Sequence, residues 1–163
     1  MNRQYIKLPH IIMLVLSYVF MVASIIMALV YVVNSAGAEV PTHFDISGEA
    51  DAYGSAGSIM MLPVIFLITN ISMTFMLFFY SFEYWNHPMK KINPNAAKYV
   101  YSDDAWLLTV TVFSFSVLSA AYVATAVYNP SLFTVVLIPI VVILLVVTTG
   151  LIVKMNMDNK KYA

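Results

Sequence analysis

Four long apolar runs constrain this chain more than any other feature of its sequence. They are Ile11–Val33, Ile59–Phe82, Trp106–Tyr128 and Leu132–Val153, and none contains Asp, Glu, Lys, Arg or His. A helix of about 20 apolar residues crosses a hydrocarbon core of about 30 Å. Because the backbone has no water to bond there, each run must satisfy itself as a helix. The sequence therefore predicts an all-α integral membrane fold, a four-helix transmembrane bundle in one domain, 1–163.

Composition agrees with a membrane protein and excludes several classes of function. The chain is 61% hydrophobic and 10% charged, whereas soluble domains carry about 25% charged residues. A formal net charge of zero leaves no basic patch for nucleic acid, so no nucleic-acid partner is expected. The absence of cysteine excludes disulfides and thiolate chemistry. The first run is longer than the ~7–15 apolar residues of a signal peptide, so we expect an uncleaved first helix.

The basic residues predict the orientation of the bundle. All eight lie at the N-terminus, after the fourth run, or in the loop 83–105: Arg3, Lys7, Lys90, Lys91, Lys98, Lys154, Lys160 and Lys161. The loop 34–58 and the turn 129–131 contain none. Basic loops stay in the cytoplasm, so both termini and the loop 83–105 are expected there, with the loop 34–58 outside. The short turn 129–131 predicts that the third and fourth runs form an antiparallel helical hairpin.

The outer loop contains the densest group of chemically capable side chains. The segment Pro41–Ser55 includes a histidine and three carboxylates without any Lys or Arg. Thr42–Ile46 alternates polar and apolar residues, which indicates an extended strip. Turns predicted at Ser47-Gly48 and Tyr53-Gly54 would fold the strip back. Carboxylates late in the segment would then approach its histidine.

Two chemical interpretations of this loop remain open. Imidazole and carboxylate ligands suit a divalent cation, with His43, Asp45, Glu49 and Asp51 as candidates. Their spacing matches no EF-hand, no HExxH and no nucleophile elbow, so we expect no catalytic residue and no cofactor beyond such a cation. The same side chains are typical caps of turns and helix ends. A rigid loop of this kind also suits ligand recognition, with candidates His43, Phe44, Asp45, Gly48, Glu49, Asp51, Tyr53 and Gly54.

The region around this loop resembles a known family. Pro41, His43, Phe44, Gly48, Asp51, Tyr53, Gly54, Leu62 and Pro63 form the pattern P-x-H-F, then G-x-x-D-x-Y-G, then L-P. This pattern is similar to that of a bacterial membrane domain of unknown function, which forms the N-terminal part of SdpI-type immunity proteins. The resemblance implies a protein of the bacterial cytoplasmic membrane. It also implies protection against a membrane-active peptide toxin, and a relay that holds a repressor at the membrane.

Polar residues within the runs favour packing over transport. Ser116, Ala120 and Ala124 recur at four-residue spacing, which lets helices approach closely in lipid. Asn70 is expected to bond a neighbouring helix. Thr111 and Ser114 leave open a polar path through the third run, as in a small permease. The runs lack the ionisable residues that ion and proton relays use.

Several residues on the cytoplasmic side have structural expectations. His10 should lie at the membrane interface, and His87 on a solvated helix end closed by Pro88. Ser102 or Asp103 should cap the third helix, with Asp103 and Asp104 favouring its N-terminal dipole.

We therefore expect a non-enzymatic membrane protein of the immunity or peptide-sensing type. Its expected partners are the lipid bilayer, an extracellular peptide, and a cytoplasmic regulator or membrane partner, with a homo-oligomer as a further option. The alternatives are a small permease or transporter accessory subunit, and a membrane metalloprotein that uses the outer loop.

Overall fold

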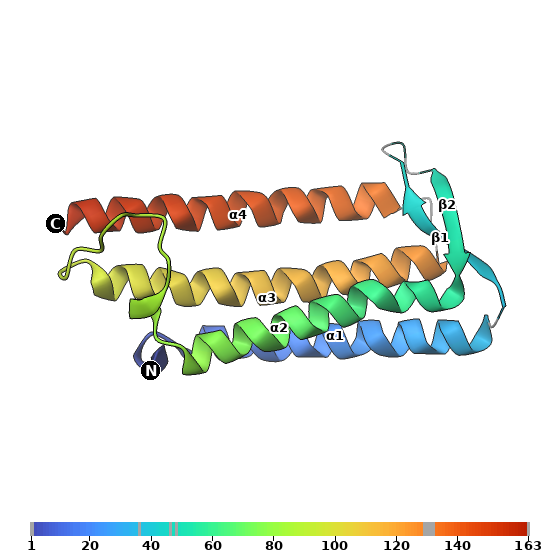
Figure 1. Ribbon diagram of the computed structural model, residues 1–163, viewed down its shortest axis with the longest axis horizontal. Helices are drawn as coiled ribbons and strands as arrows, with labels where there is room; N and C mark the ends of the chain where they lie inside the picture. The colour runs from blue at the N-terminus through green and yellow to red at the C-terminus, as the bar shows by residue number, and fades with distance from the viewer. Residues whose placement is uncertain (1, 36, 46, 48, 129–132, 163) are drawn as a thin grey trace.

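The protein is a bundle of four long helices with a β-hairpin at one end. The structure, a computed structural model, describes residues 2–35, 37–45, 47, 49–128 and 133–162. Its elements within these residues are η1 (Asn2–Gln4), α1 (Leu8–Asn34), β1 (Glu39–Phe44), β2 (Ala50–Ser55), η2 (Ala56–Met60), α2 (Met61–Phe79), η3 (Phe82–Tyr84), α3 (Ala97–Tyr128) and α4 (Phe133–Lys161). Both chain termini lie at the end opposite the hairpin (Figure 1). We call these two ends the hairpin end and the terminal end.

The predicted fold class is confirmed. Among the described residues, four helices are long and apolar enough to cross a membrane. The protein is therefore a multi-pass membrane protein in contact with lipid. Helices α3 and α4 lie side by side and antiparallel (Figure 1), as the sequence predicts, although the turn 129–131 itself lies outside the described residues.

Helix α3 is the centre of the bundle. It packs against α1, α2 and α4, whereas α4 packs mainly on α3; Figure 1 shows α3 between α4 and the α1–α2 pair. The buried side of α3 includes Val112, Ser116, Ser119 and Val123. None of the apolar window of α4 is buried inside the protein. Helix α4 is therefore held in place mainly by α3 and by contact with lipid.

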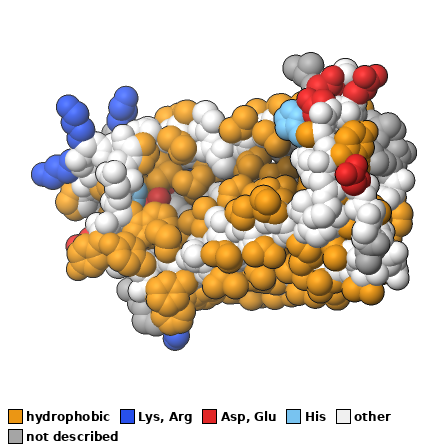
Figure 2. Space-filling view, turned by 45° about the vertical axis from the view of Figure 1, so that its right-hand side comes forward, with side chains coloured by type: hydrophobic (Ala, Val, Ile, Leu, Met, Phe, Trp, Pro, Cys, Tyr) orange, Lys and Arg blue, Asp and Glu red, His pale blue; other side chains and the backbone are white. Residues whose placement is uncertain are grey.

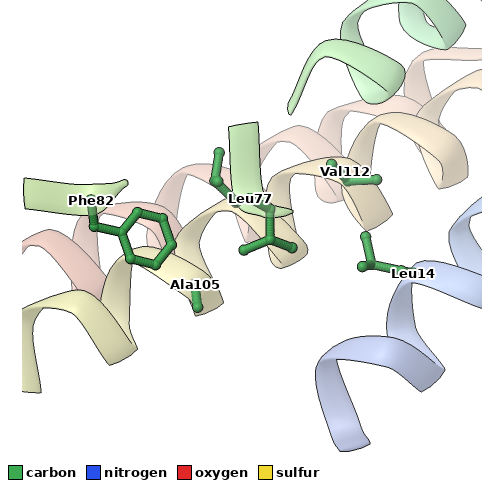
Figure 3. Close-up of a cluster of buried hydrophobic side chains, with 6 residues drawn as sticks. Leu14, Leu77, Phe82, Ala105 and Val112 are labelled. Atoms are coloured by element: carbon green, nitrogen blue, oxygen red, sulfur yellow. The ribbon is translucent and has the colours of Figure 1, made fainter. Parts of the chain in front are cut away.

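Two apolar clusters hold the ends of the bundle. At the terminal end, Leu14, Leu77, Phe82, Ala105 and Val112 from α1, α2, η3 and α3 pack together (Figure 3). At the hairpin end the cluster joins α1, η2 and α3 through Ala28, Ile59, Val123 and Ala126. Because lipid is as apolar as these side chains, close packing and not exclusion from water stabilises both clusters.

The end of α2 is closed by a side chain from the N-terminus. Asn2 Nδ2 donates to the carbonyl oxygens of Leu77 at 3.1 Å and Tyr80 at 2.6 Å, and Asn2 Oδ1 accepts from the Phe82 N–H at 3.1 Å. These bonds satisfy backbone groups that a helix end leaves open. Helix α2 therefore ends at Phe79, before the predicted limit at Phe82.

The expected cap of the third helix is wrong. Helix α3 begins at Ala97, so Ser102 and Asp103 lie inside it and do not cap it. Asp103 and Asp104 are buried within the helix, where they contact Lys154 and His87 as described below. The sequence prediction places the start of the helix at the start of the apolar run, Trp106. The helix begins earlier, at Ala97, because its first turns also make buried contacts with the protein.

Candidate functional site

The loop 34–58 contains a two-stranded antiparallel hairpin. Val40 pairs with Gly54 and Pro41 with Tyr53, and the register shifts on both sides of the His43–Ala52 pair. The predicted turn at Tyr53-Gly54 is therefore wrong, because both residues lie within β2. A glycine fits at position 54 because a Cβ there would lie 2.9 Å from Thr42 Cγ2.

The hairpin is anchored on the helices. Val40 is 2% exposed and Ala56 is 5% exposed, so apolar side chains at the base of both strands are buried. The Ala56 N–H donates to the Ala38 carbonyl at 3.1 Å, which continues the pairing below the strands. Strand β1 and helix α1 both contact η2. The base of the hairpin is thus packed against the helices.

Asp45 organises the connection between the strands. Its Oδ1 accepts hydrogen bonds from Ser47 N at 2.8 Å, Ser47 Oγ at 2.6 Å and Glu49 N at 2.9 Å. The Asp45 N–H donates to the Glu49 carbonyl at 2.9 Å. This is the capping role that Asp favours in turns, and it agrees with the turn predicted at Ser47. Gly48 and the side chain of Phe44 lie outside the described residues.

The hairpin brings together two of the four metal-ligand candidates. His43 Nδ1 lies 2.5 Å from Asp51 Oδ1, and the two side chains are 67% and 50% exposed. The Asp45 carboxylate accepts hydrogen bonds within the turn, and Glu49 contacts Asp45 through its backbone N–H and carbonyl. Within the described residues no group of three or more His, Asp and Glu side chains is arranged to hold a metal. The geometry provides a cross-strand contact between imidazole and carboxylate, and a capped turn.

Acidic side chains gather on the hairpin, and lysines at the opposite end. Figure 2 shows carboxylates and a histidine over the hairpin, with blue cations at the far end of the bundle. The exposed carboxylates are Glu39, Asp45, Glu49 and Asp51, which we call the acidic hairpin. Tyr53 is 61% exposed beside them. The loop 34–58 has no Lys or Arg to offset this charge.

Two pairs of polar side chains join neighbouring helices. Asn70 Nδ2 donates to Ser116 Oγ at 2.8 Å, which is the helix–helix contact that the sequence leads us to expect. Ser24 and Ser119 hydroxyls lie 2.7 Å apart between α1 and α3. Ala120 and Ala124 are half-buried beside the most buried side of α3. The small and polar residues thus serve packing.

An apolar groove lies between α3 and its neighbours α1 and α4. It has a volume of about 340 Å³ and is lined by Met13, Val110, Phe113, Ser114, Val117, Ile140, Ile143, Leu144 and Val147. Ser114 is the one polar side chain in this lining, and Thr111 Oγ1 donates to the Leu107 carbonyl at 2.7 Å. If the protein were a small permease, this groove between α1, α3 and α4 would offer its substrate a mostly apolar surface.

The terminal end contains contacts of two buried carboxylates that sequence reasoning missed. His87 Nε2 lies 2.8 Å from Asp104 Oδ2, so His87 is not on a solvated helix end. Lys154 Nζ donates to Asp103 Oδ1 at 2.6 Å and to Asp158 Oδ2 at 2.9 Å. The adjacent acids of α3 thus bind two different partners, the loop before α3 and helix α4. The sequence signal for these contacts was the pair Asp103-Asp104 directly before the apolar run that starts at Trp106.

His10 lies in the first turn of α1 and faces the interior of the bundle. Its side chain is fully buried, and its ring lies 4.1 Å from the Trp106 ring, centroid to centroid. Its Nδ1 accepts a hydrogen bond from the Lys7 N–H at 3.0 Å. The imidazole therefore serves as a cap for the start of α1 and as a contact with α3.

A family model matches part of the chain. The family model described as "Domain of unknown function (DUF1648)" matches residues 19–67. These residues include most of α1, the hairpin, η2 and the first turns of α2. No curated protein and no solved structure matches the chain. The match thus includes the hairpin and its anchoring helices but assigns no role.

Proposed function

We propose that this chain is a non-enzymatic protein of the bacterial cytoplasmic membrane that recognises a cationic membrane-active peptide through its acidic hairpin. It acts in immunity or sensing, as in the SdpI-type proteins that the sequence resembles. Both termini lie in the cytoplasm, where a regulator or membrane partner receives the signal. The carrying observation is the exposed acidic hairpin seated on an apolar bundle.

Charge and position support a cationic peptide as the ligand. Four exposed carboxylates without a nearby Lys or Arg raise the local concentration of cations. Membrane-active peptides with a basic face approach the bilayer surface, which is the level at which the hairpin emerges from α1 and η2. Exposed Tyr53 adds an amphipathic aromatic surface of the kind enriched at protein interfaces.

A rigid hairpin also favours recognition energetically. Binding costs free energy when loops must be ordered, and a preformed site avoids this cost. The Asp45 turn, the strand pairing and the buried base of the hairpin order it in advance. The His43–Asp51 pair leaves both side chains accessible to a ligand.

Survival of sensitive bacteria is the direct test. Cells that express the chain would be exposed to a panel of cationic membrane-active peptides and compared with cells that carry an empty vector. Expression should protect against at least one peptide, and the Glu49→Gln, Asp51→Asn variant should protect less. Glu83→Gln is the matched control, because it removes an exposed charge at the terminal end. Unchanged survival across the panel would reject the proposal.

A binding measurement separates recognition from other causes of survival. Purified protein in zwitterionic nanodiscs should bind the protective peptide, and affinity should fall as salt increases because exposed charges are screened. The hairpin variant should bind more weakly than wild type, and Glu83→Gln should bind equally. Binding that is insensitive to both salt and the hairpin variant would place recognition elsewhere.

A divalent-cation site is the second candidate, favoured by the contact between His43 and Asp51. Imidazole and carboxylate are both metal ligands. Metal analysis of purified wild type and of His43→Ala tests this candidate. Stoichiometric metal that is lost in the variant would support it, and the absence of metal at near-neutral pH would count against it.

A further inference from the structure

A polar cavity lies at the terminal end between the N-terminal segment and the start of α3. It has a volume of about 300 Å³ and is lined by Gln4, Tyr5, Lys7, Lys98 and Ser102. Every one of these side chains has a hydrogen-bond donor, and two carry a positive charge. The lining contains no carboxylate. The cavity therefore has the chemistry of an anion site.

Neither of its two lysines has a carboxylate partner among the described residues. In the part of the chain that the structure describes, the ion pairs involve His43, His87 and Lys154, and neither Lys7 nor Lys98 takes part in one. A neighbouring cavity offers a contrast, because its lysines Lys90 and Lys91 share the lining with Glu83. Two cations without a counter-charge around one cavity favour an anionic occupant.

The cavity also lies beside the ends of two candidate membrane helices, where lipid headgroups are expected. Lys7 directly precedes α1, whose first residue Leu8 is 71% exposed on the apolar surface. Lys98 lies in the first turn of α3, before the apolar run that starts at Trp106. Lysines and aromatic residues at helix ends mark the membrane–water interface. An anion at this position would have lipid tails next to it.

We propose that this cavity binds the phosphate of an anionic phospholipid. The ammonium groups of Lys7 and Lys98 face the phosphate, and the hydroxyl groups of Tyr5 and Ser102 donate to its oxygens. The acyl chains follow the exposed apolar surface of α1, which begins at Leu8. Bound lipid would thereby join the N-terminal segment to α3. Basic pockets between helices are known to hold lipid headgroups.

Native mass spectrometry of the full chain in detergent tests this proposal. The protein is equilibrated with phosphatidylglycerol or phosphatidylcholine of identical acyl chains, and bound lipid is counted at each concentration. We expect tighter binding of phosphatidylglycerol. Lys7→Gln, Lys98→Gln should weaken it about 25-fold, because each lysine contributes about 1 kcal/mol, or about fivefold. Lys7→Arg, Lys98→Arg keeps the charge and should keep most of the binding.

The matched control is Lys90→Gln, Lys91→Gln, which removes the same charge from the same end of the bundle. It should leave phosphatidylglycerol binding unchanged. Equal affinity for the two lipids, or equal loss in both glutamine variants, would overturn the proposal. A third arm adds inorganic phosphate as competitor. Displacement of the lipid by millimolar phosphate would assign the cavity to a free anion and overturn the lipid assignment.

Discussion

His87 Nε2 lies 2.8 Å from Asp104 Oδ2, and the two side chains are only 5% and 3% exposed. This contact ties the loop before α3 to the helix at the centre of the bundle. Asp103, the preceding residue, binds Lys154 of α4. Consecutive carboxylates of one helix thus hold two elements that have few other polar contacts with it.

Removal of His87 should destabilise the fold strongly. His87→Ala leaves the Asp104 carboxylate buried without its partner, and such loss typically costs about 3–5 kcal/mol. The unfolding free energy in detergent, followed by circular dichroism, measures this. His43→Ala removes the other histidine–aspartate pair, which is exposed, and should change stability little. Equal effects of the two variants would contradict the structural role of His87.

Lys154 should control how firmly the end of α4 is held. Lys154→Met removes the bonds to Asp103 and Asp158, so hydrogen exchange should accelerate in the last turns of α4. Because Lys154 is 54% exposed, we expect a loss of only about 1 kcal/mol in local stability. Lys161→Met is the control, since Lys161 lies over the Tyr162 ring and forms no ion pair among the described residues. Similar exchange in both variants would refute the tether.

Gly54→Ala should loosen the hairpin. The new Cβ would meet Thr42 Cγ2 at 2.9 Å, and such overpacking costs about 1–3 kcal/mol. Limited proteolysis within residues 39–55 should become faster. Thr42→Ser removes the opposing methyl group, so the double variant should recover protection. Failure of this rescue would show that the clash is not the cause.

The Asn70–Ser116 bond should contribute modestly to helix association. Polar contacts between membrane helices average about 0.6 kcal/mol, and Asn70 Oδ1 has no partner among the described residues. A double-mutant cycle with Asn70→Ala and Ser116→Ala, measured by unfolding in detergent, isolates the coupling. A coupling above about 2 kcal/mol would indicate a larger polar network than the structure shows.

The orientation can be tested cleanly because the chain has no cysteine. Ser47→Cys places a thiol on the exposed hairpin, and Asn95→Cys places one in the exposed loop before α3. A membrane-impermeant maleimide should label Ser47→Cys in intact cells, but Asn95→Cys only after permeabilisation. The reverse pattern would invert the topology that the basic residues predict.

The hairpin shows how far sequence reasoning reached. Alternation along Thr42–Ile46 and the turn signal at Ser47 predicted a strand that folds back, and Asp51 does meet His43. The Tyr53-Gly54 turn was wrong because its glycine provides close strand approach, not a change of direction. In sequence, a glycine that permits a turn and a glycine that permits close approach of two strands look alike. Only the residue that faces the glycine, here Thr42, distinguishes the two roles.

The sequence by itself determined the four membrane helices, since apolar runs without ionisable residues have no other stable arrangement in lipid. It also determined that the loop 34–58 carries one histidine and four carboxylates without any Lys or Arg. Only the tertiary structure decided what the charged residues contact. His87, Asp103 and Lys154 are far apart in sequence, and their roles depend on which helices become neighbours. The reason is physical: hydropathy is a local property of the chain, whereas an ion pair or a lysine-lined cavity exists only after packing brings distant residues together.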